Sequence, residues 1–513
     1  MPNKEYTLGT RGSLLAITQS QQILDQLKDL SGCDFKVQKI KTQGDQIVDK
    51  PLWQLDGKDF FTKELDEQLL AGNIDFVVHS YKDLGSDRPQ GIELTSITKR
   101  AYPHDILLVR KEVLQNKPKN FIIGTSSPRR TVNLQEALIP YIPWQVDQIE
   151  IKNLRGNVNT RIEKLIEGNY DAIVLAFAGI ERLAKNIENQ PLLQQYFFNL
   201  DYMILPLSEF PTAAAQGALA IEVGPKTPQE LKDIIAKTHC EKTAREVKWE
   251  KEKFRSYGGG CHLPMGICAQ ESENGLWTLA KGKATPDSTE YINESTMKVA
   301  DANFEKTNIE KLFVGLSEKD LAMNNTESEI EIISDELYLK KPIDQKCQAK
   351  HLYATSKHVL HAVHHEQRET LWCAGTKTWQ KLAEEGHWVN GSSDQFGEEH
   401  LVNFFKSALL QLLHGGQFQK NMQVLTNEDA PIKFGKKVTC YSREMKQPDD
   451  SVKQNLENCE HFYWTSFSQY QAYCKAVPAI VSKNHYCGLG KSADRFQDAN
   501  IKVTKIRRWS DLI

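Results

Sequence analysis

The chain has 513 residues, a length typical of three or four domains. Charged residues make up 26% and the net charge is −3, so a general polyanion-binding protein is excluded and any basic site has to be local. Ten cysteines without a CxxC pair indicate reduced cytoplasmic thiols rather than a disulfide framework or a metal site. The first residues, MPNKEYTLGTRGS, lack the apolar core of a signal peptide, and the longest apolar stretch, around 173–180, is too short to span a bilayer.

From residue 7 to about 222, short apolar strands alternate with amphipathic helices. The predicted elements include strands at 6–8, 75–78, 121–123 and 172–176 and a helix at 160–167. This alternation predicts α/β layers around mostly parallel sheets. Pro225 and Pro228 mark a break, after which residues 229–255 are predicted as one charged helix.

The last part of the chain is predicted as a separate unit at 351–513, after a polar linker at 318–350 that lacks periodicity. Inside this unit, LYATSKH at 352–358 recurs as FYWTSFS at 462–468. CAGTKTWQKLAEEG, which starts at Cys373, recurs in the same way as CGLGKSADRFQDAN, which starts at Cys487. The two similar spacings predict two related α/β halves, with chance matching as the alternative.

Basic side chains follow several predicted strands, where ligands bind in open α/β sheets. They lie in TRGS, HSYKD, GTSSPRR and LRGNVNTR, and comprise Arg11, Lys82, Arg129, Arg130, Arg155 and Arg161. Helix N-termini favour anions, and planar guanidinium groups match carboxylates. The chain has neither a Walker loop nor GxGxxG, and aromatic residues are not interleaved with these arginines as in a nucleic-acid site. We therefore expect a small ligand with many carboxylates; for any single base, a surface salt bridge is the alternative.

Two further residues carry reactive groups in unusual settings. Asp83 directly follows Lys82, so it is a carboxylate among cations, which keep it ionised and suit it to stabilise a cationic intermediate and pass protons. The alternative interpretation is that Asp83 is a helix cap or an ordinary surface residue. Cys261 follows three glycines, which allow close approach of a ligand, so it is more typical of a reactive thiol than of a small buried residue.

Several strings in the first 310 residues resemble the hydroxymethylbilane synthase (porphobilinogen deaminase) family and occur in its order. They are TRGSLLAITQ, TQGD, GKDFFTKELD, DFVVHSYKD, GTSSPRR, LRGNVNTR, YDAIVLAFAGIERL, AAQGALAIE and GGGCHLP. Each is weak alone, but the set is specific and covers residues 5–310. The resemblance implies a transferase of haem biosynthesis that joins four porphobilinogen molecules head to tail, with loss of ammonia, on a covalently attached dipyrromethane cofactor.

The resemblance also implies roles for individual residues. The cofactor is a thioether of Cys261, and the catalytic residues are Asp83, which stabilises the azafulvenium cation, and Lys82. The residues implied to hold the cofactor and the growing chain are Ser80, Lys82, Asp83, Thr125, Ser127, Arg129, Arg130, Arg155 and Arg161. Those implied near the incoming substrate are Arg11, Ser13, Gln19 and Lys58, the last in a mobile lid from Gln46 to Phe61. The departures from the family pattern, at Leu84–Gly85, Pro128 and His262, remove no group that the mechanism needs.

The fold class implied is α/β, with two hinged doubly wound domains and a small α+β third domain that carries the cofactor cysteine. The expected boundaries are 1–105 with 205–223 for domain 1, 106–204 for domain 2 and 226–317 for domain 3. We expect a cytoplasmic monomer that binds porphobilinogen and linear polypyrroles but neither nucleic acid nor membrane. Solute-binding modules also consist of two hinged α/β domains and are the alternative interpretation, but a binding module would not need the GGGC turn.

Residues 351–513 resemble uroporphyrinogen-III synthase, which would cyclise the same product, in a two-lobed α/β region. Thr465, Ser466 and Ser492 match its polar binding positions in kind, and Tyr441 matches a family tyrosine. The opening strand with its Thr-Arg-Pro signature is missing, so an interaction module is the alternative. His358, His361, His364 and His365 have the helical spacing of a metal site, but a polar helix face is favoured and no metal is expected.

Overall fold

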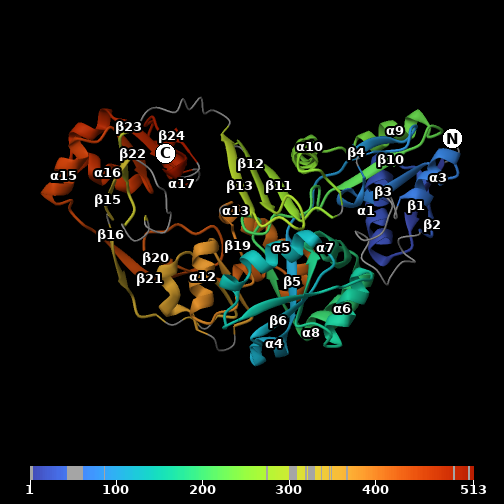
Figure 1. Ribbon diagram of the computed structural model, residues 1–513, viewed down its shortest axis with the longest axis horizontal. Helices are drawn as coiled ribbons and strands as arrows, with labels where there is room; N and C mark the ends of the chain where they lie inside the picture. The colour runs from blue at the N-terminus through green and yellow to red at the C-terminus, as the bar shows by residue number, and fades with distance from the viewer. Residues whose placement is uncertain are drawn as a thin grey trace.

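The computed structural model describes residues 4–42, 62–85, 87–260, 262–272, 275–299, 309–317, 321, 330–336, 338–345, 347, 349–364, 368–394, 396–488, 491–506 and 509–512. In these ranges the chain is a mixed α/β protein whose strands form five sheets (Figure 1). None of the helices described is both long enough and apolar enough to cross a membrane.

The first sheet has the strand order β2-β1-β3-β10-β4 and lies at the N-terminal end of the molecule (Figure 1). Its strands and helices are β1 (Glu5–Arg11), α1 (Leu14–Ser31), β2 (Asp34–Ile40), α3 (Lys63–Ala71), β3 (Phe76–Ser80), β4 (Glu93–Ile97), β10 (Leu219–Val223) and α9 (Gln229–Ala236). β1 pairs in parallel with β2 and β3, whereas β10 runs antiparallel to β3 and β4. Leu8, Phe76 and Ile221 lie in its buried core, so a strand from residue 219 onward completes a sheet begun at residue 5.

The second sheet repeats this pattern with the order β7-β6-β8-β5-β9, in which β5 is antiparallel to both neighbours. Its elements are β5 (Asp105–Arg110), α4 (Lys111–Asn116), β6 (Asn120–Gly124), α5 (Pro128–Ala137), β7 (Gln148–Lys152), α6 (Val158–Ile166), β8 (Ala172–Ala176), α7 (Phe177–Lys185), α8 (Gln190–Phe198) and β9 (Leu200–Ile204). The strand predicted at 172–176 is confirmed at both ends. Ser127 caps α5, and Pro128 follows it in the first turn.

The third sheet is antiparallel and consists of β11 (Met265–Ser272), β12 (Gly275–Gly282) and β13 (Ile292–Val299), next to helix α10 (Glu241–Ser256). The single helix predicted at 229–255 is wrong, because α9 ends at Ala236 and α10 begins at Glu241. The chain between them bonds to β4: the His239 ring accepts the N–H of Ile97 over 3.1 Å, and the N–H of Cys240 donates to the Ile97 carbonyl over 2.8 Å. These contacts replace the helical bonds that the charge pattern predicts.

Residues from 309 onward form two further sheets. Lobe A, residues 338–445, contains β16 (Tyr338–Pro342), β17 (His351–Ala354), β18 (Thr370–Cys373), α12 (Thr376–Glu384), β19 (Gly391–Ser392), α13 (Glu398–Phe405), α14 (Ala408–His414), β20 (Gln423–Asn427) and β21 (Lys436–Met445). Lobe B, residues 309–336 and 449–512, contains β14 (Lys311–Val314), β15 (Glu331–Ser334), α15 (Asp450–Glu457), β22 (His461–Trp464), α16 (Phe467–Ala476), β23 (Asn484–Cys487), α17 (Lys491–Asp498) and β24 (Thr504–Lys505).

Two sequence-based expectations differ from this arrangement. The segment 318–350, predicted as a linker, contains β15 and β16, which are short strands at sheet edges and so lack a clear apolar pattern. The end of the third domain, predicted at 317, also differs, because β14 lies before residue 318 and pairs in parallel with β15 and β22. Residues 311–314 therefore belong to the last sheet and not to the third domain.

The two lobes have the same spatial arrangement of parallel strands, but the chain passes through those strands in a different order in each lobe. Lobe B has β15-β14-β22-β23-β24, and lobe A has β21-β20-β17-β18-β19 with β16 added antiparallel to β21. The repeated TS segments follow the equivalent strands β17 and β22. In both lobes the threonine hydroxyl donates to a carbonyl of the neighbouring strand segment: Thr355 to Leu425 over 2.9 Å, and Thr465 to Gly315 over 3.1 Å. The sequence repeat thus corresponds to a repeated strand–helix arrangement.

Lobe A packs directly on the second sheet (Figure 1), and the two share buried apolar cores. Trp388 stacks on Trp144 with ring centroids 6.2 Å apart, and Trp379 contacts Tyr141 edge to face at 5.5 Å. Beside β9, the backbone N–H of Ile204 donates to the Asn390 carbonyl over 2.8 Å. Burial of aromatic area on this scale fixes the relative position of the two parts.

Candidate functional site

The first part of the site lies where β1 and β3 of the first sheet end. Gln19 of α1 donates from Nε2 to Ser80 Oγ over 2.9 Å, which joins α1 to the end of β3. Arg11, Gln19, Ser80 and Asp83 line one small cavity of about 40 Å³. Ser13 lies beside them, but its side chain caps α1 by accepting the N–H of Ala16 over 3.3 Å. The structure thus brings together four of the predicted residues and gives Ser13 a structural bond.

Asp83 is the exposed last residue of a 3-10 turn, Tyr81–Asp83, that follows β3. Its charge acts on the cations around it, because it opposes the lowering of the pKa of Lys82 and of Arg161. Burial is the main cause that lowers the pKa of Lys82, and the charges of Arg130 and Arg129 add to it. Asp83 therefore faces a cationic surface while remaining open to a ligand.

Lys82 connects the first sheet to a buried network in the second. Its Nζ donates to Gln216 Oε1 over 3.4 Å, and Gln216 Nε2 donates to Asp105 Oδ1 over 2.9 Å. Asp105 also accepts from Arg129 Nη2 over 2.9 Å and from Arg130 Nη2 over 2.7 Å. The two guanidinium groups hold the pKa of Asp105 well below its usual range despite burial. Sequence analysis missed Asp105 and Gln216, although Gln216 lies inside the AAQGALAIE string.

Arg129 and Arg130 are both nearly buried, and the structure gives them partners inside the protein. Arg129 donates to the Pro211 carbonyl over 3.1 Å and Arg130 to the Val174 carbonyl over 2.9 Å. Their fixed position comes from α5, whose first turn begins at Pro128 beneath the capping Ser127. Their direct bonds are therefore structural, while their charges contribute to the site.

Arg155 and Arg161 complete the cationic group from the loop before α6 and from α6 itself. Arg161 Nε donates to the Gly156 carbonyl over 2.7 Å. Burial, followed by the charges of Arg130 and Arg155, lowers the pKa of Arg161 to about 10. Thr125 is buried at the end of β6, and its hydroxyl accepts the N–H of Ser127 over 3.2 Å.

Taken together, five described cations, Lys82, Arg129, Arg130, Arg155 and Arg161, surround the two carboxylates Asp83 and Asp105. Cations that depress one another's pKa are stabilised when an anion joins them. Such a group, placed at strand ends of the first and second sheets, has the charge and position that suit a ligand with several carboxylates.

Two predicted residues, Cys261 and Lys58, lie outside the described residues, as does the whole predicted lid at 46–61. The turn that leads to Cys261 is described, and Gly258, Gly259 and Gly260 all have positive φ, at 100°, 64° and 94°. L-residues with side chains rarely adopt three such conformations in succession, so this turn requires glycine.

In the C-terminal part, Thr465, Ser466 and Ser492 meet at one end of the lobe B sheet. Ser492 Oγ donates to the Thr465 carbonyl over 3.2 Å, and Ser466 caps α16 by accepting the N–H of Gln469 over 3.2 Å. Tyr441 lies in lobe A, where its hydroxyl accepts from Ser356 over 3.4 Å. The structure therefore groups three of the four residues and leaves Tyr441 in the other lobe.

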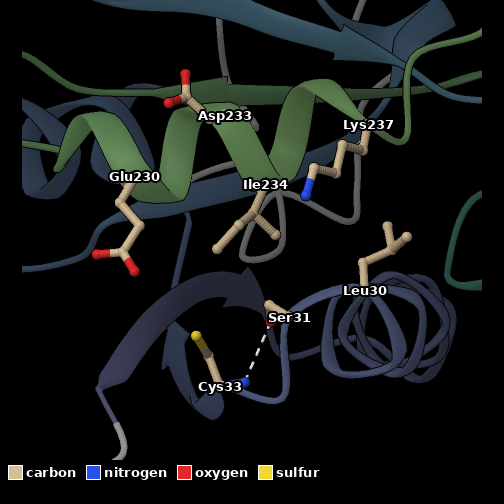
Figure 2. Close-up of a pocket in the computed structure, with 7 residues that line it drawn as sticks. All are labelled: Leu30, Ser31, Cys33, Glu230, Asp233, Ile234 and Lys237. Atoms are coloured by element: carbon tan, nitrogen blue, oxygen red, sulfur yellow. Dashed lines mark hydrogen bonds between the residues drawn. The ribbon is translucent and has the colours of Figure 1, made fainter. Parts of the chain in front are cut away.

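A wider groove of about 490 Å³ lies between α1 and α9 and contains none of the predicted site residues (Figure 2). Glu230 of α9 and Lys237, which directly follows α9, extend toward the side of Leu30 and Cys33 (Figure 2), and Asp233 also lines the groove. Its two carboxylates make it unsuited to a polycarboxylate ligand, in contrast to the cationic group.

Comparison with known proteins shows the family of the chain. A family model described as the porphobilinogen deaminase, dipyrromethane cofactor binding domain matches residues 6–232. Porphobilinogen deaminase of Helicobacter hepaticus is 37% identical over 294 residues, which cover 57% of this chain and 85% of the relative. The Neisseria meningitidis enzyme is 36% identical over 303 residues, covering 59% and 90%. The chain belongs to the porphobilinogen deaminase family, and is a transferase of porphyrin biosynthesis with a dipyrromethane cofactor.

Solved structures give weaker likenesses. The second substrate-binding domain of an amino acid ABC transporter from Streptococcus pneumoniae is 13% identical with a TM-score of 0.29, and covers 49% of this chain and 97% of its own. The periplasmic VFT2 domain of Bordetella pertussis BvgS is 14% identical with a TM-score of 0.26, covering 46% and 86%. At these TM-scores neither likeness bears on the function of this chain.

Proposed function

We propose that the chain condenses four porphobilinogen molecules head to tail into hydroxymethylbilane, at the cationic group around Asp83. The observation that carries this proposal is the excess of positive charge among Lys82, Arg129, Arg130, Arg155 and Arg161 beside a single exposed carboxylate. Each pyrrole unit brings carboxylate side chains, and a charge-assisted hydrogen bond contributes about 1.5–3 kcal/mol. A polypyrrole is therefore the kind of ligand that this group would hold.

The residues described fit the dipyrromethane cofactor. Its carboxylates would meet Arg155, Arg161 and Lys82, whose pKa values burial lowers and a bound anion would raise. The glycine turn at 258–260 exposes the backbone next to Cys261, which we propose as the point of thioether attachment. When bound, the cofactor supplies the free pyrrole carbon to which the first substrate is joined.

In the proposed reaction Asp83 acts on the substrate twice. The aminomethyl C–N bond breaks and ammonia leaves, and the carboxylate stabilises the positive charge that develops on the pyrrole. A new C–C bond then forms at the free α-carbon of the preceding ring, and Asp83 accepts the proton that this carbon loses. Arg11 and Gln19, which line the same cavity as Asp83, would hold the carboxylates of the incoming substrate.

Intact-mass spectrometry of the purified full chain tests the attachment site. Wild-type protein made in a porphobilinogen-producing host should carry the mass of a dipyrromethane and give colour with an acidic aldehyde reagent for pyrroles. Cys261→Ser should show neither, whereas Cys33→Ser, a half-buried cysteine of the first sheet, should keep both. An unmodified wild-type mass would overturn the proposal.

We also propose that lobes A and B cyclise the product to uroporphyrinogen III. Support comes from the strand order of lobe B, because open sheets of the order 2-1-3-4-5 bind ligands where the order reverses. In lobe B that point lies between β14 and β22, next to Thr465, Ser466 and Ser492. A second site tethered to the first also raises its effective concentration near an unstable product.

Isomer analysis of the product tests this second proposal. The full chain is given porphobilinogen, and uroporphyrins I and III are separated after oxidation. A truncation near Glu318 is a poor control, because it would expose the apolar face that lobe A covers, so Ser466→Ala with Ser492→Ala in the full chain is preferable. Isomer III should dominate in the wild type and fall in the double variant. Isomer I alone from the wild type would favour an interaction module.

A further inference from the structure

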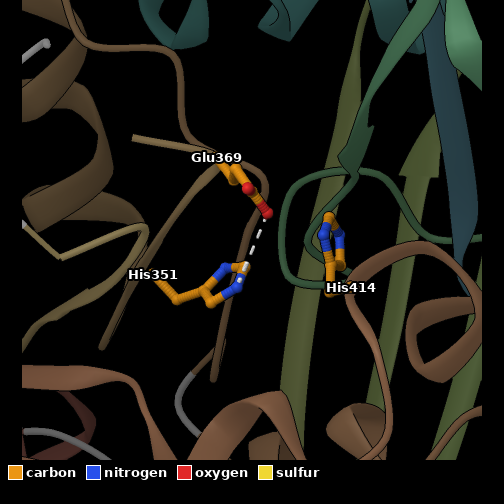
Figure 3. Close-up of side chains that lie close together, drawn as sticks. All are labelled: His351, Glu369 and His414. Atoms are coloured by element: carbon orange, nitrogen blue, oxygen red, sulfur yellow. Dashed lines mark ion pairs between the residues drawn. The ribbon is translucent and has the colours of Figure 1, made fainter. Parts of the chain in front are cut away.

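Two histidines and a glutamate converge where lobe A meets the second sheet (Figure 3). His351 comes from β17, Glu369 immediately precedes β18, and His414 is the last residue of α14. One possible ligand atom from each side chain lies within 4.8 Å of those of the other two. Neither proposed reaction uses these groups.

We infer that His351, Glu369 and His414 bind a divalent transition metal, of which zinc fits the ligand set best. Zinc takes imidazole nitrogen and carboxylate oxygen, and two histidines with one glutamate leave its fourth position to water. Harder cations such as magnesium prefer sets made of oxygen alone. The mixed nitrogen and oxygen set therefore selects the class of ion.

The exposure of the three groups suits a metal. Glu369 is exposed, whereas His351 is buried and His414 half-buried, so an ion can reach the three groups from solvent on the side of Glu369. The site is therefore accessible without a change in the fold.

Two neighbouring hydroxyl groups fix the histidine rings. Thr370 Oγ1 lies 3.0 Å from His351 Nδ1, which leaves Nε2 free, 3.7 Å from the Glu369 carboxylate (Figure 3). The Tyr202 hydroxyl lies 2.8 Å from His414 Nε2, which leaves Nδ1 for the metal. Hydrogen bonds of this kind orient ligand rings in metal sites.

A second group of possible ligands in the described part of the chain, Asp66, His79 and Glu222, has a different explanation. Arg88 Nη2 donates to Asp66 over 2.6 Å and to Glu222 over 2.8 Å, so a guanidinium already supplies the positive charge there. At Glu369 the nearby cation is the exposed Lys350, whose Nζ lies 2.6 Å from one carboxylate oxygen. The other oxygen faces His351 and stays available.

The inferred ion would stabilise lobe A where it contacts the second sheet, because all three ligands belong to lobe A and one of them, His414, bonds to Tyr202 of β9. Binding to the folded state alone raises stability by mass action. Zinc should therefore raise the unfolding temperature of the full chain and should not be required for porphobilinogen consumption.

Calorimetric titration of the chelator-treated full chain with zinc chloride tests the site. The wild type should bind zinc, and His414→Gln and Glu369→Gln should each weaken that binding about tenfold or more. His361→Gln, which changes an exposed histidine of the same lobe, should bind like the wild type. Thr370→Val should weaken binding by about tenfold while keeping all three ligands.

Circular dichroism first establishes that each variant is folded. Absence of zinc binding to the wild type at micromolar protein would overturn the inference. Equal binding by the wild type, His414→Gln and Glu369→Gln would also overturn it, because the ion would then lie elsewhere.

Discussion

Asp394 of lobe A accepts a hydrogen bond from the backbone N–H of Ser208 over 2.9 Å. The Ser208 hydroxyl bonds to the same carboxyl group, which is 1% exposed. Burial raises the pKa of Asp394 to about 7, against the opposing effect of these bonds. The contact between lobe A and the segment after β9 therefore contains a group that titrates near neutrality.

Asp394→Asn should make the full chain less sensitive to pH. An unfolded aspartate ionises near pH 4. Between about pH 4 and pH 7 the folded chain keeps a proton that the unfolded chain releases, so the free energy of unfolding falls as pH rises, by on the order of 4 kcal/mol. The variant lacks this loss, and asparagine tolerates the positive φ of 47° at this position.

Thermal unfolding at pH 5 and pH 8 measures the effect. The unfolding temperature of Asp394→Asn, relative to the wild type, should rise from the lower to the higher pH. Asp25→Asn, an exposed aspartate on α1, serves as the control and should follow the wild type at both values. Parallel curves for Asp394→Asn and the wild type would show that the carboxyl group is ionised throughout.

Asp105→Asn should destabilise the second sheet strongly. The change leaves Arg129 and Arg130 buried without their shared counter-charge, and breaking a buried pair in this way costs about 3–5 kcal/mol. Glu150→Gln removes a surface ion pair with Lys152 in the same sheet and should cost at most about 1 kcal/mol. Denaturant unfolding compares the two, and equal midpoints would contradict a structural role for Asp105.

The parts of the fold with local signals were predictable. The strand at 172–176 is a continuous apolar run, and Pro128 is typical of the first turn of a helix, here α5, so both elements could be predicted from neighbouring residues. The break between α9 and α10 depends on bonds from residues 239 and 240 to Ile97, far away in sequence, which a local charge pattern does not contain.

The site residues also divide into those with a local sequence signal and those without one. Arg11, Lys82 and Asp83 follow strands directly and could be found from the motifs. Asp105 and Gln216 act through contacts that span 24 to 134 residues, and an isolated Asp or Gln carries no signal for such a contact. The three inferred zinc ligands, His351, Glu369 and His414, also lack a recognisable spacing in the sequence, because His414 comes from α14, elsewhere in lobe A.

Asp83→Asn should keep the fold and lose most turnover. The amide is isosteric but carries no charge to stabilise a cation, and losses of about a hundred- to thousandfold follow from removing such a group. Asp87→Asn, an exposed aspartate four residues along, is the control. Steady-state consumption of porphobilinogen measures both, and near-normal turnover in Asp83→Asn would remove this residue from the mechanism.

Lys82→Arg should shift the alkaline limb of the activity profile. Burial lowers the pKa of Lys82, so its charge, and with it the attraction for substrate carboxylates, is lost at a lower pH than for free lysine. Arginine stays protonated throughout the accessible range, so in the variant the fall in kcat/KM should begin at higher pH. An unchanged limb would assign that titration to another group.

The last prediction separates the cations by the intermediate that each one serves. Arg11 lines the small cavity with Asp83 and Gln19, so Arg11→Ala should impair entry of the monomer and leave the cofactor in place. Arg155 and Arg161 lie across the site near α6, so Arg155→Ala should impair cofactor assembly or the first extension. Arg130→Ala should resemble Arg155→Ala but also lower stability, because Asp105 would lose one of its two arginines.

Native mass spectrometry after a brief exposure to porphobilinogen distinguishes these cases. Arg11→Ala should accumulate the cofactor-only form, whereas Arg155→Ala should contain apoprotein or stall after one added unit. Lys185→Ala, which changes a largely exposed base on α7, should show the wild-type series of intermediates. Bonds to separate carboxylates should act at different lengths of the growing chain. Identical distributions of intermediates for Arg11→Ala and Arg155→Ala would mean that the cations act together at every length. The assignment of each cation to one stage would then fail.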